Sequence, residues 1–139
     1  MKEIRFICNK EEGHMKVIHT DKAPKALGPY SQGYVHNGIF YSAGQSPINP
    51  KTGEIEGKDI KEQTEQMCQN FAAVLEAAGS SFEKVLRVDC YLKNLDDFQG
   101  FNEVYAKYFV SKPGRSCVQV SDIPKGALCT AELIAVAED

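Results

Sequence analysis

Apolar and polar positions recur along the chain with two different periods, and these periods predict most of the elements. The clearest helical pattern runs over 59–78, where six apolar residues can share one face: Ile60, Met67, Phe71, Val74, Leu75 and Ala78. Asp59 can cap the first turn as part of a capping box with Glu62. Gly79 can end the helix, because glycine adopts the left-handed conformation at little cost. We therefore predict a one-faced helix here.

A second apolar stripe predicts another helix over roughly 96–110. Its members are mostly aromatic: Leu95, Phe98, Phe101, Tyr105, Tyr108 and Phe109. Gly100 lies inside this stripe and costs the helix about 1 kcal/mol relative to alanine.

Shorter segments alternate with a period of two and predict strands. Within 84–92 the alternation puts Leu86, Val88, Cys90 and Leu92 on one face, and Arg87, Asp89 and Tyr91 on the other. Asn37-Gly38 separates two β-type runs, and this dipeptide favours a tight hairpin turn. The predicted strands cover 16–20, the hairpin 33–44, 84–92, 116–121 and 129–138.

The order of these elements predicts an α+β fold. Two one-faced helices can cover one face of a mixed sheet and form a two-layer domain. The other face then exposes Val85, Ile134 and Val136, which need cover. An oligomer that packs sheet against sheet supplies it.

Length and charge narrow the picture further. The 139 residues suit one domain, which we place at 15–139 after an N-terminal extension at 1–14. The net charge is −3 and no run of basic residues occurs, so the sequence gives no electrostatic reason to bind nucleic acid. No apolar run is long enough to span a membrane.

The cysteine spacing and the lack of known motifs disfavour several kinds of site. The five cysteines are irregularly spaced without a Cys-x-x-Cys pair, which disfavours a disulfide framework or a zinc site and favours a reducing cytoplasm. No motif for a metal, nucleotide or phosphate occurs. We expect no cofactor and no metal.

The segment KPGRSCVQV (112–120) carries the best candidate for chemistry. Arg115 stays charged at any working pH and can bind a carboxylate through two parallel hydrogen bonds. Cys117, two residues on, points to the same side of a strand. It could be a thiol activated by this cation, although no histidine stands in a motif with it. A surface salt bridge and a buried small residue are the alternatives that spacing alone favours.

Other candidates are single polar or aromatic residues in apolar or turn-rich surroundings. Glu132 lies within the apolar run AELIAV and must be paired or solvated, so it either pairs with an arginine or orients a water. Thr130 shares its strand face. Tyr30 follows the rigid Gly28-Pro29 turn and can cap a pocket. Asn102 lies on the second helix and can donate to a ligand or cap a loop.

Several of these segments together resemble the Rid (YjgF) family, in particular its RidA-like branch. The similarity covers essentially residues 15–138 and rests on GPYSQG (28–33), AGQSPINPKTGE (43–54), QNFAAVLEAAGSSFEKV (69–85), FNEVY (101–105), PGRSCVQV (113–120) and ELIAVA (132–137). The resemblance implies a chorismate-mutase-like fold and a homotrimer with one pocket at each subunit interface. It also implies hydrolysis of reactive enamines and imines, such as 2-aminoacrylate, 2-iminopropanoate and 2-iminobutanoate, to 2-keto acids and ammonia.

The resemblance assigns roles to individual residues. Arg115 matches the arginine that grips the substrate carboxylate, and Cys117 matches a cysteine that lines the pocket. The other matches are the pocket aromatic, the helix asparagine and the glycine before a glutamine: Tyr30, Asn102 and Gly44.

Two positions depart from the family pattern. Ala43 stands where the family has a serine, and Thr130 stands where it has the carboxylate thought to activate water. Glu132 is the second carboxylate of that pattern and lies about 6.5 Å further along the strand. Because a general base contributes about 10²–10⁴-fold, we expect a weakened deaminase in which Arg115, Thr130 and Glu132 carry the catalysis.

Two other functions fit the same residues. A regulatory protein on this scaffold would bind 2-keto acids or similar carboxylates without turnover. Inhibition of translation initiation or endoribonuclease action ranks last, because the chain is acidic and lacks a basic stripe.

Overall fold

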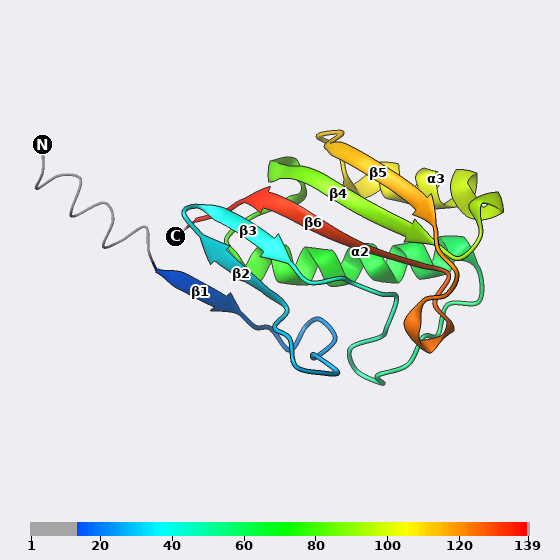
Figure 1. The fold of residues 1–139 in the computed structure, drawn as a ribbon, viewed down its shortest axis with the longest axis horizontal. Coiled ribbons are helices and arrows are strands. Elements are labelled where there is room, and N and C mark those ends of the chain that lie inside the picture. Colours follow the sequence, from blue (N-terminus) through cyan, green and yellow to red (C-terminus); the bar gives the residue numbers. More distant parts are fainter. Residues whose placement is uncertain (1–13, 139) are drawn as a thin grey trace, which may run out of the picture.

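The computed structural model describes residues 14–138. The expected extension at 1–14 therefore lies, except for His14, outside the described residues. Six strands and two α-helices follow one another in the predicted order (Figure 1): β1 (Met15–Ile18), β2 (Gly33–His36), β3 (Ile39–Ser42), α2 (Ile60–Ala77), β4 (Val85–Leu92), α3 (Phe98–Tyr108), β5 (Gly114–Gln119) and β6 (Cys129–Val136).

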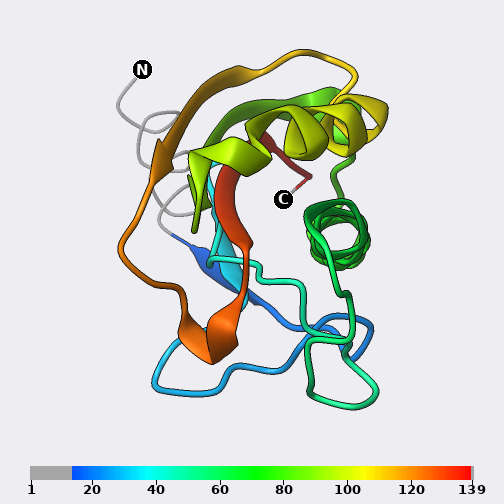
Figure 2. The same cartoon turned by 90° about the vertical axis from the view of Figure 1, so that its right-hand side faces the viewer.

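The strands form one mixed sheet in the order β1-β2-β3-β6-β4-β5. Only the β4–β5 pair is parallel; the other neighbours are antiparallel. Asn37 and Gly38 form the β2–β3 turn with φ values of 51° and 75°, as the Asn-Gly signal predicts. Both helices lie on the same side of the sheet (Figure 2), which confirms the two-layer α+β fold.

Helix α2 is the element that the sequence predicts best. Asp59 caps it, accepting a hydrogen bond from the backbone N–H of Glu62 at 2.9 Å. The Glu62 carboxylate accepts from the N–H of Lys58 at 2.8 Å, one residue before the partner expected in a capping box. Gly79 follows the helix with φ of 71°, in the left-handed region.

Helix α3 is shorter than predicted. Residues Leu95–Asp97 form a separate 3-10 turn whose N-terminus is capped by Asn94, so the α-helix starts at Phe98. Gly100 marks the close approach of the two helices, because a Cβ there would lie 2.9 Å from Cγ2 of Ile60. The glycine that weakens the helix therefore allows it to pack on α2.

Strand β4 corrects the predicted alternation at its start. Val85 is 4% exposed and Leu86 is 50% exposed, the reverse of the expected faces. The register against β6 shifts between Val85 and Arg87, which is an irregularity of the β-bulge type. From Val88 onward the alternation holds, because Val88, Cys90 and Leu92 are buried.

The boundaries of β5 also differ from the expectation. The strand starts at Gly114 instead of residue 116, so Arg115 lies within it and pairs with Val88 of β4. Pro113-Gly114 reads as a turn in the sequence, yet Gly114 already pairs with Arg87.

The sheet face opposite the helices carries several large apolar side chains. Exposed residues there include Tyr34, Tyr41, Leu86, Val118 and Val136. On β6, every second side chain faces the helices and is buried in the core: Cys129, Ala131, Leu133 and Ala135. Within the part of the chain that the structure describes, no helix is long and apolar enough to cross a membrane.

Candidate functional site

Strand β5 and helix α3 together hold the guanidinium of Arg115. It lies over the ring of Tyr105, 4.8 Å from the centroid, and 5.5 Å from that of Phe98. Its Nη1 donates a 2.7 Å hydrogen bond to the Asn102 side-chain oxygen. Among residues 14–138 no carboxylate forms an ion pair with Arg115. Its charge is therefore oriented by aromatic rings and an amide and is available to an anion.

Cys117 lies two residues from Arg115 on the same side of β5 and is half-buried. Burial raises the pKa of its thiol, and the nearby Arg115 only partly opposes this rise. The thiol is therefore neutral near pH 7, when a nucleophile would need the thiolate. This favours the interpretation of Cys117 as a residue that lines a site.

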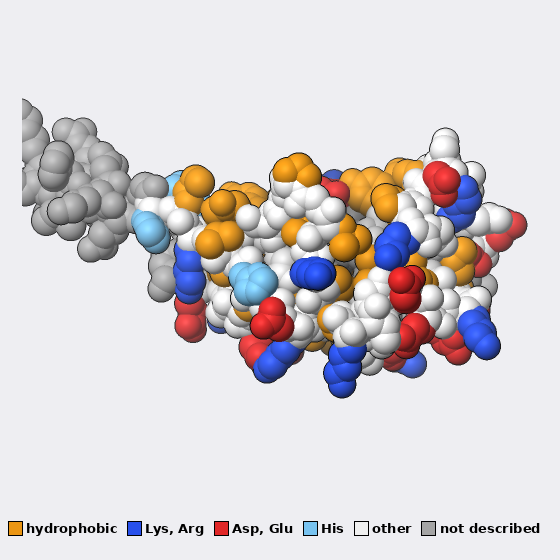
Figure 3. All heavy atoms as spheres, turned by 90° about the horizontal axis from the view of Figure 1, so that it is seen from below, with side chains coloured by type: hydrophobic (Ala, Val, Ile, Leu, Met, Phe, Trp, Pro, Cys, Tyr) orange, Lys and Arg blue, Asp and Glu red, His pale blue; other side chains and the backbone are white. Residues whose placement is uncertain are grey.

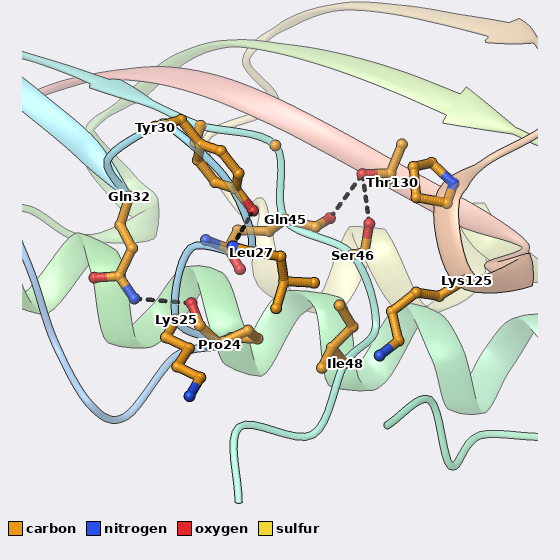
Figure 4. Close-up of a pocket in the computed structure, with 13 residues that line it drawn as sticks. Pro24, Lys25, Leu27, Tyr30, Gln32, Gln45, Ser46, Ile48, Lys125 and Thr130 are labelled. Carbon is orange, nitrogen blue, oxygen red and sulfur yellow. Dashed lines mark hydrogen bonds between the residues drawn. The ribbon is translucent and has the colours of Figure 1, made fainter. Parts of the chain in front are cut away.

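A cavity of about 380 Å³ lies on another part of the molecule, between the loops that precede β2 and follow β3 (Figure 4). Four residues singled out in the sequence line it: Tyr30, Ala43, Gly44 and Thr130. The rest of its wall consists of Pro24, Lys25, Leu27, Gln32, Gln45, Ser46, Ile48, Pro124 and Lys125.

Two hydroxyl groups form one wall of this cavity, and their hydrogen bonds have only one possible direction. Oγ1 of Thr130 lies 3.1 Å from the backbone carbonyl of Gln45, which can only accept, so Thr130 donates its proton there. Oγ of Ser46 lies 3.1 Å from Oγ1 of Thr130 and must therefore be the donor of that pair. Both protons are used, and the hydroxyls offer only lone pairs to a ligand.

The loop that carries this wall is fixed by buried polar contacts. Asn70 of α2 donates from its side-chain amide to the carbonyls of Ser46 and Ile48, both at 2.9 Å. Residue 45 pairs with Ala131 of β6 through backbone hydrogen bonds in both directions. The wall is therefore held by both layers of the fold.

Tyr30 covers the cavity from the loop before β2. Its hydroxyl accepts a 3.1 Å hydrogen bond from the N–H of Leu27, which leaves its own proton free to donate. Gln32 ties down the same loop, because its side-chain amide bonds to Thr20 and to the Pro24 carbonyl.

Glu132 is placed elsewhere. It does not line the cavity, and its carboxylate accepts a 3.0 Å hydrogen bond from the Tyr91 hydroxyl on the exposed sheet face. Desolvation and this carboxylate raise the pKa of Tyr91, which stays a neutral donor. The contact gives a charged residue in mid-strand a hydrogen-bond partner, and the catalytic role expected for Glu132 stays a prediction.

The candidates therefore form two groups that do not meet within one chain. Arg115, Cys117 and Asn102 lie on the helix side of the sheet at its β5 edge. Thr130 lies on β6 between buried residues, so its side chain points to the other side, and β4 separates its strand from β5.

Sequence reasoning missed several residues of the cavity. Ser46 and Gln45 lie inside a quoted motif but carry no charge pattern, and only the folded loop brings them to Thr130. Lys25 and Lys125 lie 100 positions apart and meet the same cavity through two different loops. Among residues 14–138 no cluster of His, Cys, Asp and Glu is suited to a metal ion.

The fold and the cavity define a small α+β protein with a pocket of the size that small ligands occupy. The family model described as Endoribonuclease L-PSP matches residues 20–137. The RutC family protein PH0854 from Pyrococcus horikoshii is 52% identical over 124 residues, which cover 88% of this chain and 98% of that protein.

Solved structures agree with the sequence match. A Rid-family protein of unknown function from Yersinia pestis, YyfA, has a TM-score of 0.86 and 44% identity, covering 89% of this chain and 100% of that chain. TdcF from E. coli, determined with bound serine, has a TM-score of 0.84 and 38% identity, covering 88% of this chain and 99% of that chain. The chain belongs to the Endoribonuclease L-PSP family, the Rid and YjgF family that its motifs resemble.

Proposed function

We propose that the protein hydrolyses reactive imines and enamines that carry a carboxylate, at a site completed by two subunits of a homotrimer. The observation that supports this most is the separation of the two groups. Among residues 14–138 Arg115, at the β5 edge, has no carboxylate partner, and Thr130 of the cavity wall points to the opposite side of the sheet. A neighbouring subunit can bring one group to the other, as the exposed apolar sheet face also suggests.

The roles follow from the chemistry of the groups. Arg115 of one subunit binds the substrate carboxylate, with Asn102 and Cys117 beside it. The cavity of the next subunit holds the imine carbon near Gly44 and the hydroxyl wall. Water adds to that carbon, the carbon–nitrogen bond breaks, and a 2-keto acid and ammonia leave without any change in oxidation state. Holding the substrate and water in place supplies most of the acceleration.

The hydroxyl wall also explains why we expect weak activity. A water that donates to Thr130 or Ser46 has a lone pair free to attack, so the wall can orient it. Neither hydroxyl can take up the proton near neutral pH, and the site lacks the roughly 10²–10⁴-fold that a general base contributes.

The test measures hydrolysis of 2-iminobutanoate, generated by a threonine dehydratase and followed through semicarbazone formation. We expect the wild-type protein to accelerate hydrolysis and Thr130→Glu to increase kcat/KM further, by about tenfold to 100-fold. This gain is smaller than a full general base gives, because an ionised glutamate cannot donate to the Gln45 carbonyl as Thr130 does.

Thr130→Gln is the matched control, since it has the size of glutamate without a base, and we expect it to lower the rate. The proposal is wrong if neither the wild type nor Thr130→Glu accelerates hydrolysis. A binding-only function then remains, and calorimetry with 2-ketobutyrate tests it. The bound serine in the TdcF structure supports this second function, because it is a small carboxylate in a relative.

A further inference from the structure

The charge on the cavity wall is of one sign. Among the residues that the structure describes, the basic side chains Lys25 and Lys125 line it and no carboxylate does. Arg115, which we expect to hold the substrate carboxylate, lies outside this wall. The cavity therefore offers positive charge in addition to the one cation that a monocarboxylic imine needs.

Lys25 is the freer of the two lysines. Its ammonium forms no hydrogen bond or ion pair with any residue in 14–138, although it lines the cavity. It also lines an adjoining cavity of about 330 Å³, together with Pro24, Leu27 and Ile48. A long exposed side chain at this junction can turn toward an anion from either cavity.

Lys125 is held in place by the fold. It has φ of 63°, and its ammonium donates to the Gly53 carbonyl at 2.8 Å. Its contact with Glu54 is long, 3.9 Å, and Glu54 is 71% exposed there. Two of its three ammonium protons remain available, so Lys125 can support a second anion contact.

The size and the apolar lining of the cavity agree with a longer substrate. Its volume of about 380 Å³ lies in the ~300–1,000 Å³ range of pockets for ligands much larger than 2-iminobutanoate. Leu27, Ile48 and Pro124 can contact a methylene chain. In the view of Figure 4, Lys25 and Lys125 lie below and Tyr30 and Thr130 above, so the charge is set apart from the hydroxyl wall.

On the face that Figure 3 shows, the positive charge is not part of a larger basic patch. Basic and acidic side chains intermix on this face, and no patch of one sign forms. Such a surface does not favour a polyanion, whereas two lysines at one cavity suit a single small anionic group.

We propose that the preferred substrates are dicarboxylic imines, such as 2-iminosuccinate and 2-iminoglutarate, whose second carboxylate binds Lys25 with support from Lys125. This inference rests on the imine hydrolysis proposed above. Water adds to the imine carbon, the carbon–nitrogen bond breaks, and the products are one 2-keto diacid and one ammonia.

The experiment compares kcat/KM for 2-iminosuccinate and 2-iminobutanoate, each produced from its amino acid by an amino-acid oxidase. We expect the wild type to favour the dicarboxylic imine. Lys25→Met keeps the apolar stem and removes the charge, and we expect it to lower the ratio of the two kcat/KM values by about tenfold. Added salt should lower the ratio in the wild type as well, because Lys25 is exposed.

Lys22→Ala is the matched control, because Lys22 is an exposed lysine three positions away that pairs with Glu76 and lines neither cavity. It should leave the ratio unchanged. If the wild type hydrolyses 2-iminobutanoate but shows no preference, or if Lys25→Met keeps the ratio, the dicarboxylic inference is wrong and imine hydrolysis stands.

If no imine is hydrolysed, the proposed function fails. Binding measurements then decide whether the cavity prefers a ligand with a second carboxylate. Calorimetry should then show 2-ketoglutarate binding about tenfold more tightly than 2-ketobutyrate, with the difference lost in Lys25→Met. Equal affinities of the wild type for the two acids would contradict it.

Discussion

Thr130 has one hydroxyl proton, and the fold commits that proton to the backbone carbonyl of Gln45. The sequence indicates only that a threonine stands where its relatives are expected to have a carboxylate. Which hydrogen bonds this side chain makes depends on Ser46 and on a loop 84 positions away, which no local pattern relates to β6. The chemistry of the wall thus emerges only when the loop docks on the sheet.

The reactivity of Cys117 tests whether the neighbouring Arg115 activates its thiol. Because burial outweighs Arg115 in raising the pKa of the thiol above its ordinary value of 9.0, the neutral form dominates below that pH. We expect Cys117→Ala to keep kcat/KM within about threefold, as for a small change in packing. We also expect iodoacetamide to label Cys117 slowly at pH 7 and faster only above pH 9.0.

Mass spectrometry of the labelled peptide checks this, with the Cys117→Ala protein as the blank. Rapid labelling at pH 7, together with a loss of activity of about 100-fold or more in Cys117→Ala, would instead indicate a nucleophilic thiolate.

At the scale of elements, helix α2 was easier to predict than the starts of strands β4 and β5. The apolar stripe of α2 is long, and its Asp59 and Gly79 signals place both ends within one residue of those observed. The β4 prediction failed at Leu86, because a period of two assumes an unbroken register and the shift between Val85 and Arg87 interrupts it. For β5, Pro113-Gly114 signalled a turn, but pairing with β4 made Gly114 extended.

Gly100 links the two helices, and its replacement tests how closely they pack. Alanine should gain about 1 kcal/mol of helix propensity. Its Cβ would however lie 2.9 Å from Cγ2 of Ile60, a stiff β-branched side chain, and overpacking of this kind costs about 1–3 kcal/mol. We expect Gly100→Ala to lower the free energy of unfolding by about 1 kcal/mol, measured by urea denaturation.

A double-mutant cycle with Ile60→Ala tests whether the clash with Ile60 causes the loss of stability in Gly100→Ala. Without Cγ2 the clash is gone, so Gly100→Ala should stabilise the Ile60→Ala protein by up to about 1 kcal/mol. The same sign of effect in both backgrounds would show that Ile60 does not set the spacing of the helices.

At the scale of the whole molecule, the candidate residues form two separate groups within one chain, around Arg115 and around Thr130. Period and spacing predicted the sheet and the apolar residues on its second face. They therefore also predicted that an oligomer buries this face. They could not show that Arg115 and Thr130 point to opposite sides, because the order of β6, β4 and β5 in the sheet is set by long-range pairing. Only the resemblance to the family implies the intersubunit site that we propose for the two groups.

Mixing two defective proteins tests this arrangement directly. Arg115→Ala should lose about 10–150-fold in kcat/KM, as expected for a charge-assisted carboxylate contact. Gly44→Leu should block the cavity, since Gly44 lines it and a Cβ there lies 3.7 Å from Oγ1 of Thr130. In a closed trimer that mixes equal amounts at random, about one site in four receives both intact halves. Unfolding and refolding the two proteins together should therefore recover about a quarter of wild-type activity.

A mixture of Arg115→Ala with Asn102→Ala is the control, because both changes fall in the Arg115 group. Every interface then receives a defective copy of that group, and the mixture should not gain activity. An active mixture requires that one chain's Arg115 serve another chain's cavity. If the site were built within single chains, every chain in the Arg115→Ala and Gly44→Leu mixture would carry a defect. Activity would then stay at the mean of the two variants, and light scattering on the same sample would show whether a trimer had formed.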